Sequence, residues 1–153
     1  NPTINKESAR IMSLVDPKVK MSKSDENDNS RINLTDSPDI ISKKFARAVT
    51  DSGSEIKFDV AKKPGISNLL NILSAITQKP ITDLEKEYRG KNYGEFKANV
   101  AKEVIKLLEP VQEKFKKLNN KEVTTILKEG AEKAAPTAQE TLSRVKKTVG
   151  LGL

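Results

Sequence analysis

The sequence has 153 residues, of which 35% are hydrophobic and 32% are charged, and this is enough chain to bury one core. No apolar run approaches the roughly 20 residues that a membrane span needs, and no secretory signal is visible. The chain contains no cysteine and no histidine, which excludes a disulfide framework, a histidine-ligated metal site and a Ser-His-Asp arrangement. We therefore expect a soluble, cytoplasmic protein with no membrane partner and no metal site.

The net charge of +7, from 28 basic and 21 acidic residues, suits a polyanionic partner such as RNA. The excess is moderate, and many soluble domains carry as much without binding nucleic acid. Charge alone therefore leaves RNA binding open. The first residue is Asn rather than Met, from which we expect a piece of a longer protein or a processed product.

The first part of the chain, to residue 36, has few large apolar side chains. Residues 10–15 are short and apolar, which predicts a strand that ends at Asp16-Pro17. Residues 18–36 are polar, and the stretch 25–30 can bury almost nothing, so the sequence predicts a mobile surface loop. Such mobility suits an element that closes over a ligand and then opens.

From residue 37 onward the sequence predicts helices. Ser37 followed by proline is a favourable helix start, and apolar spacing extends that helix to about residue 50. In residues 56–60 apolar and polar side chains alternate, which predicts a short extended run. Residues 66–76 are apolar on most of the helix circumference and predict the central core helix. A capping-box pattern at 82–85 predicts a further short helix.

Two long amphipathic helices complete the predicted fold. The first runs from about residue 96 to 118 with a kink at Pro110, and the second carries apolar residues from 123 to 149. Pro136 is expected to bend or split the second helix. We therefore expect a mainly α protein, a helical bundle over residues 37–153, preceded by a short strand and a loop.

The most informative stretch is Lys20-Met21-Ser22-Lys23-Ser24, which we call the signature loop. Two ammonium groups and two hydroxyls within five residues suit the binding of a polyphosphate, because lysines act as mobile charges and hydroxyls complete the hydrogen bonding. The alternative is a solvated Lys/Ser loop, which is the common case for an arbitrary basic pentapeptide. The neighbouring sequence favours the first interpretation.

The signature loop follows the stretch Ala9-Arg10-Ile11-Met12-Ser13-Leu14-Val15-Asp16-Pro17 and is followed by Asp25. Together these residues resemble the second (KMSKS) signature of class I aminoacyl-tRNA synthetases in its tryptophanyl form. Further pieces follow in the order of bacterial-type tryptophanyl-tRNA synthetases: Ala48-Val49-Thr50-Asp51-Ser52, Lys63-Pro64-Gly65-Ile66-Ser67-Asn68-Leu69-Leu70-Asn71-Ile72, Tyr93-Gly94-Glu95-Phe96-Lys97 and Glu129-Gly130-Ala131-Glu132-Lys133-Ala134. The resemblance covers nearly the whole chain, and it is the ordered series that points to this family.

The resemblance implies the role of each residue in the loop. In the family this loop binds ATP while tryptophan is activated, so Lys20 and Lys23 are the implied catalytic residues. The implied ATP contacts are Ile11, Lys20, Met21, Ser22, Lys23 and Ser24, with Mg²⁺ accompanying ATP. Residues 1–36 would then be the C-terminal edge of a Rossmann-type catalytic domain, and 37–153 the α-helical anticodon-binding domain that receives tRNA(Trp).

The resemblance also implies what this chain lacks. The L-tryptophan pocket and the first family signature lie in an N-terminal half that is absent here, so the portion alone is expected to be unable to activate tryptophan. Family members are homodimers. The second functional interpretation is a free-standing RNA-binding helical module that has kept the loop.

Candidate RNA-phosphate contacts are basic residues on the first helix and near a tyrosine-containing turn: Lys43, Lys44, Arg47, Arg89 and Lys91. The alternative for each is a solvated helix face. Tyr88 and Tyr93 favour core or turn packing over stacking on bases. The sequence does not identify the anticodon-reading residues.

Overall fold

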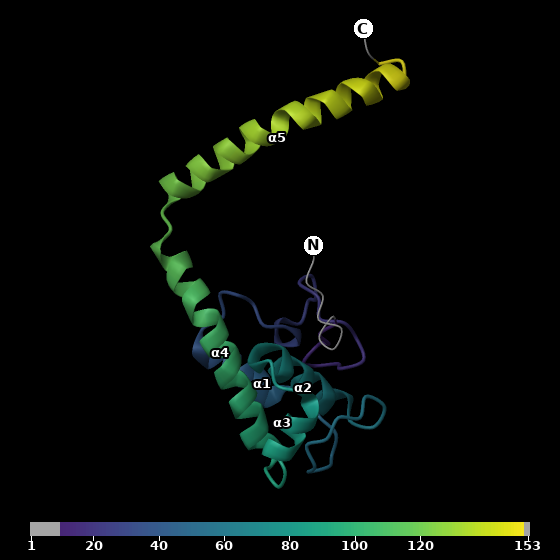
Figure 1. Ribbon diagram of the computed structural model, residues 1–153, viewed down its shortest axis with the longest axis vertical. Helices are drawn as coiled ribbons and strands as arrows, with labels where there is room; N and C mark the ends of the chain where they lie inside the picture. The colour runs from purple at the N-terminus through teal and green to yellow at the C-terminus, as the bar shows by residue number, and fades with distance from the viewer. Residues whose placement is uncertain (1–9, 152–153) are drawn as a thin grey trace. The chain divides into compact units, whose positions relative to one another are not determined.

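The structure is a computed structural model that describes residues 10–151, and over these residues the chain is mainly helical, as predicted (Figure 1). It divides into two compact units, Asn1–Gln112 and Glu113–Leu153. The elements in chain order are a 3₁₀ turn η1 (Asp28–Ser30) and the helices α1 (Pro38–Arg47), α2 (Pro64–Thr77), α3 (Ile81–Glu87), α4 (Tyr93–Lys117) and α5 (Asn120–Thr148).

Helix α1 begins as the sequence predicts. The Ser37 hydroxyl accepts a hydrogen bond from the Ile40 N–H at 3.3 Å, and proline occupies the first helical position. The helix ends at Arg47, earlier than predicted, because Ala48 leaves the helical conformation at ψ 134°. The Lys97 ammonium donates to the Ala48 carbonyl oxygen at 2.8 Å and so satisfies this helix end.

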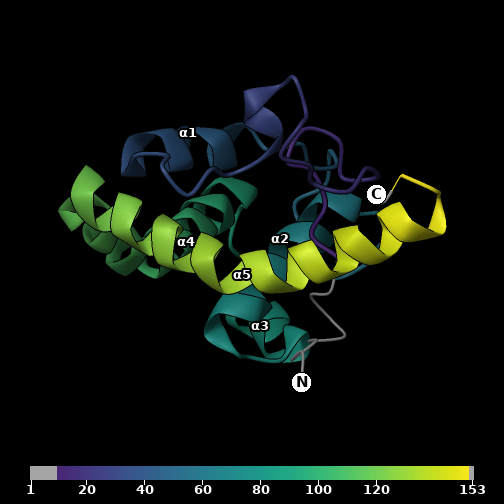
Figure 2. The same cartoon turned by 90° about the horizontal axis from the view of Figure 1, so that it is seen from above.

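Helix α2 is the centre of the core, which confirms its prediction. Ile66, Leu69, Leu70 and Leu73 are each no more than 1% exposed. The helix begins at Pro64, two residues before the predicted start, because proline is compatible with the first helical turn. Helix α3 packs against α2, and Figure 2 shows α3 next to α2 at the edge of the view.

The predicted capping box at 82–85 is wrong. Helix α3 begins at Ile81, so Thr82 lies inside the helix and caps nothing. The Glu85 carboxylate instead accepts a hydrogen bond from the Phe58 N–H at 2.6 Å. This contact fixes the extended run at 56–60, which forms no strand in the described structure.

The predicted strand over residues 10–15 is reduced to one antiparallel bridge, between Met12 and Lys20. The Asn68 side-chain amide bonds both the N–H and the carbonyl oxygen of Met12, each at 2.8 Å. The Leu14 N–H donates to the Ser30 carbonyl oxygen at 2.9 Å. A side chain and a loop thus satisfy these backbone groups, and within residues 10–151 no neighbouring strand extends the bridge.

Residues before position 36 share the core of the helices that follow. Leu14 is 2% exposed and belongs to the same apolar cluster as residues of α1, α2 and α4. The division between compact units therefore falls after Gln112 and not after Asp36. The boundary predicted after residue 36 concerns the parent domains and stays a prediction.

Both long helices continue through their prolines. Pro110 lies inside α4, and Pro136 lies inside α5, which Figure 1 draws as one uninterrupted helix. The predicted split at Pro136 is therefore wrong, since a proline removes one backbone hydrogen bond while the remaining turns stay bonded. Asn119 and Glu122 form a capping box at the start of α5, and none of its residues is buried. No helix within residues 10–151 is long and apolar enough to cross a membrane.

Candidate functional site

The signature loop leaves the body of the first unit at a defined point. The Met21 N–H donates to the Ile11 carbonyl oxygen at 3.0 Å, next to the bridge between Met12 and Lys20. The Asn68 amide holds Met12 in turn, so this anchor is attached to α2. We call these contacts of Ile11, Met12 and Asn68 with the start of the loop the entry anchor. It fixes the N-terminal end of the loop to the central helix.

Beyond the entry anchor, the hydrogen bonds of residues 22–24 within the described chain are made among Ser22, Ser24 and Asp25. The hydroxyl oxygens of Ser22 and Ser24 lie 3.1 Å apart and share a hydrogen bond, and the Ser24 N–H donates to the Ser22 hydroxyl at 3.3 Å. The Asp25 N–H donates to the Ser22 carbonyl oxygen at 3.4 Å. Ser22, Lys23 and Ser24 are all exposed. The two hydroxyls therefore lie on exposed residues, where an anion can reach them.

Lys20 and Lys23 are both exposed, and neither ammonium group has an ion-pair partner among residues 10–151. Two positive charges thus lie within four positions of one another without a neutralising carboxylate. Such a pair attracts an anion that carries several negative charges. These are the two residues that the resemblance singles out, and their catalytic role stays a prediction.

Ile11 and Met21 have a different environment. Both side chains are partly buried against the apolar core, and both line an apolar pocket of about 240 Å³ with residues of α1, α2 and α4. Their side chains hold the loop to the core by apolar contact. Their predicted contacts with adenine stay predictions.

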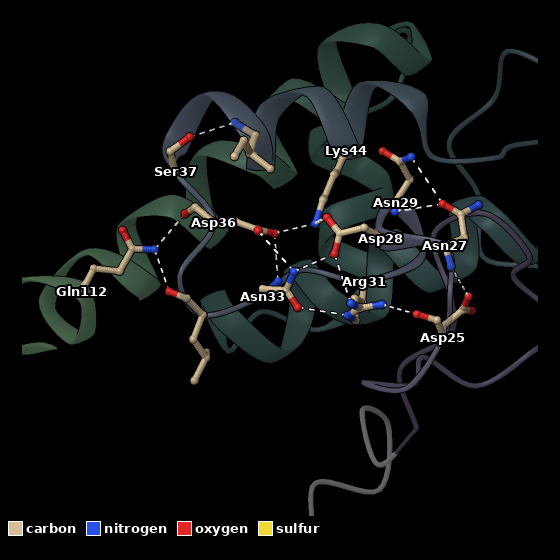
Figure 3. A network of polar contacts seen from close by, with 12 residues as sticks. Asp25, Asn27, Asp28, Asn29, Arg31, Asn33, Asp36, Ser37, Lys44 and Gln112 are labelled. Carbon is tan, nitrogen blue, oxygen red and sulfur yellow. Dashed lines mark hydrogen bonds and ion pairs between the residues drawn. The ribbon is translucent and has the colours of Figure 1, made fainter.

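A polar network holds the C-terminal end of the loop, and we call its members, Asp28, Arg31, Asn33, Asp36 and Lys44, the brace (Figure 3). The Arg31 guanidinium donates to the Asp25 carbonyl oxygen at 2.7 Å and pairs with Asp28 at 3.1 Å. The Lys44 ammonium lies 2.8 Å from a carboxylate oxygen of Asp28 and 2.8 Å from one of Asp36. The brace therefore connects α1 to the residue directly after the loop.

The burial of Lys44 overturns its predicted role as a contact for RNA phosphate. The residue is only 3% exposed. Burial lowers the pKa of Lys44, but the hydrogen bonds and charges of Asp28 and Asp36 outweigh this and raise the pKa above its ordinary value. A buried, doubly paired ammonium is not available to a phosphate. Lys43 and Arg47 are exposed on the same helix and stay predicted contacts.

The brace also corrects the prediction of a mobile surface loop over residues 18–36. Ser30 is 0% exposed and Asp36 is 7% exposed. The Asn27 side chain accepts a hydrogen bond from the Asn29 N–H at 3.0 Å and caps η1. The segment is folded because polar side chains satisfy one another, which an apolar pattern does not reveal. A surface loop remains for the exposed residues before Asn27.

A second polar cluster lies near the start of α2. The Tyr93 hydroxyl donates to Asp51 at 2.9 Å, and the Lys63 ammonium lies 3.1 Å from the same carboxylate and 2.9 Å from the hydroxyl. Burial raises the pKa of Asp51, but hydrogen bonds from Tyr93, Gly53 and Lys63 outweigh it and lower that pKa. The cluster joins the turn after α1 to the starts of α2 and α4.

Both tyrosines pack as predicted. Tyr88 is 2% exposed and meets Phe96 edge to face, with ring centroids 4.9 Å apart. The Lys91 ammonium lies 4.8 Å from the centroid of the Tyr88 ring. Tyr93 is held by the cluster described above. The buried Tyr88 ring presents no open face of the kind on which an unpaired base stacks.

A comparison with known families identifies the class of protein that carries this loop. A family model described as tRNA synthetases class I (W and Y) matches residues 2–109, which is more than half of the chain. The chain therefore belongs to the class I tRNA synthetase family that includes the tryptophan enzymes.

Individual relatives confirm the tryptophanyl resemblance. The chain is 50% identical over 150 residues to the tryptophan–tRNA ligase of Oceanobacillus iheyensis, covering 97% of this chain and 46% of that protein. It is 47% identical over 150 residues to the enzyme of Bacillus subtilis strain 168, with 97% and 46% covered. The crystal structure of tryptophanyl-tRNA synthetase from Mycoplasma pneumoniae matches with a TM-score of 0.80 at 34% identity. That match covers 97% of this chain and 47% of the neighbour. The chain thus spans about half the length of these relatives.

Proposed function

We propose that this chain supplies the ATP-handling loop and the tRNA-binding helices of a tryptophan–tRNA ligase. The observation that carries the proposal is the pair of exposed ammonium groups on Lys20 and Lys23, in a loop whose two ends are tied to the helices. The family membership supplies the reaction. The tightly satisfied polar residues around the loop support a site built to present these two charges.

In the proposed reaction the carboxylate of tryptophan attacks the α-phosphate of ATP, giving tryptophanyl-adenylate and pyrophosphate. Negative charge builds on the departing pyrophosphate as its bond to the α-phosphate breaks. Ammonium groups placed there stabilise the transition state more than the ground state. Lys20 and Lys23 take this role, and the hydroxyls of Ser22 and Ser24 donate hydrogen bonds to phosphate oxygens.

Mg²⁺ enters with ATP as part of the substrate. Within residues 10–151 no group of three acidic side chains gathers where it would bind a metal ion. The lysines of the loop therefore act beside a metal that the nucleotide brings, and the protein need not hold the ion in this part of the chain.

Several parts of the reaction lie beyond these residues. L-tryptophan binds in the half of the relatives' length that this chain does not span, and the full-length enzyme is proposed to be a homodimer in the cytoplasm. The 153 residues alone are proposed to be inactive, since the loop has no amino acid to meet. A free-standing RNA-binding module is not favoured, because the relatives that match over almost the whole chain are ligases.

The test of the loop is Lys23→Ala in an intact ligase that carries this chain. Removing an electrostatic contact to the transition state costs about a hundredfold or more in rate. We expect ATP–pyrophosphate exchange to slow by that order, while the Kd of ATP rises by much less. Lys18→Ala, which removes an exposed ammonium just outside the loop, is the matched control. Equal losses of rate and affinity for Lys23→Ala contradict the proposed role.

The test of the helices is a filter-binding titration of the 153-residue chain against tRNA(Trp) at increasing salt. Each phosphate contact contributes a slope of about −0.7 to −0.9 in log affinity against log salt. Lys43→Ala and Arg47→Ala are each expected to lower that slope by about one contact. Undetectable binding, or binding that salt does not weaken, contradicts the tRNA role of this chain.

A further inference from the structure

The signature loop is held at two ends by different helices. The entry anchor attaches its N-terminal end to α2 through Asn68 and Met12. At the other end, the contact that crosses from the brace to the loop is the hydrogen bond from Arg31 to the Asp25 carbonyl oxygen. The residues between the two ends bond only one another. The position of Lys23 therefore depends on how firmly each end is held.

We propose that Arg31 is a positioning residue for the signature loop. Its guanidinium donates a hydrogen bond to the Asp25 carbonyl oxygen and so sets the place where the Lys23 ammonium group binds its anion. The inference rests on the proposed function for the identity of the anion. It concerns a contact that the resemblance does not assign. Arg31 touches no substrate and acts through the loop alone.

The geometry of the Arg31 guanidinium carries the proposal. Its Nη1 donates to the Asp25 carbonyl oxygen at 2.7 Å, its Nη2 pairs with Asp28 at 3.1 Å, and its Nε donates to the Asn33 amide oxygen at 3.0 Å. All three nitrogens of the planar group are thus used in three different directions (Figure 3). Lysine cannot reproduce this fork, because its single ammonium group sits at one point.

The two partners that hold the guanidinium are themselves fixed. The Asn33 amide donates to Asp28 at 2.9 Å, and the Asn33 N–H donates to Asp36 at 2.9 Å. Lys44 of α1 pairs with both carboxylates, and its side chain is only 4% exposed. The two cations and the two carboxylates of the brace cancel in charge. The guanidinium is therefore part of a neutral, mutually bonded set rather than of a loose surface pair.

Helix α4 adds a second support to the same set. The Gln112 side-chain amide donates to the Leu34 carbonyl oxygen at 2.8 Å and to the Asp36 carbonyl oxygen at 2.9 Å. Residues 33–36 are thus held by α1 on one side and by α4 on the other. Arg31 transmits the position of this rigid base to the loop through one backbone contact.

The experiment compares the wild-type chain with Arg31→Gln and Arg31→Lys by ¹⁵N relaxation, using the order parameters of Ser22, Lys23 and Ser24. Arg47→Gln, which removes an exposed guanidinium from α1, is the control. We expect both Arg31 variants to lower these order parameters toward the flexible range, below about 0.6, with wild type and control clearly higher. The Met21 amide, at the entry anchor, should not change in any variant.

Three results overturn the proposal. The first is an equal set of loop order parameters in wild type and Arg31→Gln, and the second is full restoration by Arg31→Lys, which would reduce the role of Arg31 to its charge. The third is an equal loss for Arg47→Gln. All variants should unfold cooperatively in urea, so a loosened loop is not confused with an unfolded chain.

An activity readout separates this inference from the proposed function. In an intact ligase, Arg31→Gln should slow ATP–pyrophosphate exchange by about tenfold, the effect of one charge-assisted hydrogen bond. If Lys23→Ala leaves exchange intact while Arg31→Gln still loosens the loop, the proposed reaction is wrong and the positioning role stands. If Lys23→Ala abolishes exchange while Arg31→Gln changes neither readout, the positioning role is wrong and the proposed reaction stands.

Discussion

Two neighbouring stretches of this chain, residues 20–24 and residues 25–36, are both polar, yet their charged side chains differ in whether they have ion-pair partners. The first presents two lysines with no carboxylate partner in the described chain. The second carries Asp28, Arg31 and Asp36 in a network closed by Lys44. Polar residues with a full set of partners support the structure, and polar residues without partners are available to a ligand.

The difference arises from charge balance and from position. Lys44 brings its ammonium group within 2.8 Å of two carboxylates because α1 begins at Pro38, two residues after Asp36. Within residues 10–151 no ion pair reaches the signature loop: hydrogen bonds at its two ends bind backbone atoms, the Met21 side chain packs against the core, and Lys20 and Lys23 are exposed. The same comparison predicts which substitutions lower stability and which lower only activity.

The largest expected loss of stability comes from Lys44→Met. Removing the ammonium group leaves Asp36, whose side chain is 8% exposed, as a buried carboxylate without its partner. We expect a loss of about 3 kcal/mol in the free energy of unfolding, measured by urea denaturation. Lys43→Met, on the exposed side of the same helix, should change it by less than about 0.5 kcal/mol. Equal effects of the two would remove the distinction between the brace and the surface.

Asn68→Ala should have the next largest effect. The substitution leaves both the N–H and the carbonyl oxygen of Met12 without their partner, at a residue that is 3% exposed. A loss of about 2 kcal/mol is expected in the same urea assay. Asn71→Ala is the matched control, because the Asn71 side-chain oxygen is buried and has no hydrogen-bond partner in the described structure. If the control costs as much as Asn68→Ala, the entry anchor contributes nothing specific.

The brace also predicts how stability depends on acid. The hydrogen bond from Lys44, with that from Asn33, lowers the pKa of Asp28 below its ordinary value in the folded chain. A carboxylate with a lowered pKa contributes stability that is present above its unfolded pKa of about 3.9 and is lost as the pH falls through the folded value. The urea midpoint of the wild type should therefore decrease as the pH is lowered below about 4. The urea midpoint of Asp28→Asn should decrease less steeply over the same pH range. Parallel acid profiles of the two proteins would contradict this.

The smallest effect on stability is expected in the signature loop itself. Lys20→Ala and Lys23→Ala remove exposed side chains without ion pairs in the described chain, so each should change the free energy of unfolding by less than about 0.5 kcal/mol. A loss above about 1 kcal/mol for either lysine would mean that the loop side chains have structural partners, and the contrast between the two stretches would disappear.

The sequence predicts the parts of this molecule that rest on apolar periodicity or on a local cap. Helix α2 and the Ser37 start of α1 follow directly from such patterns. The signature loop and its family could be predicted because the residues that define them are contiguous. The capping box at 82–85 failed because the helix already begins at Ile81, with Pro80 at the N-cap position, and Glu85 finds a distant backbone partner.

The brace could not be predicted, for a physical reason. Asp28, Arg31 and Asp36 have the pattern of ordinary surface residues, and only the placement of α1 brings Lys44 next to the two carboxylates. For the same reason Lys44 resembled Lys43 in the sequence although one is buried and the other exposed. Long-range polar pairing leaves no periodic signal in the chain.

The central claim is that the ammonium groups of Lys20 and Lys23 serve the departing pyrophosphate. The most direct test is tRNA charging by an intact ligase that carries this chain with both lysines replaced by alanine. The account predicts a fall in the charging rate of at least about a hundredfold, with the free energy of unfolding almost unchanged. Charging at the wild-type rate by this double variant would contradict the claim.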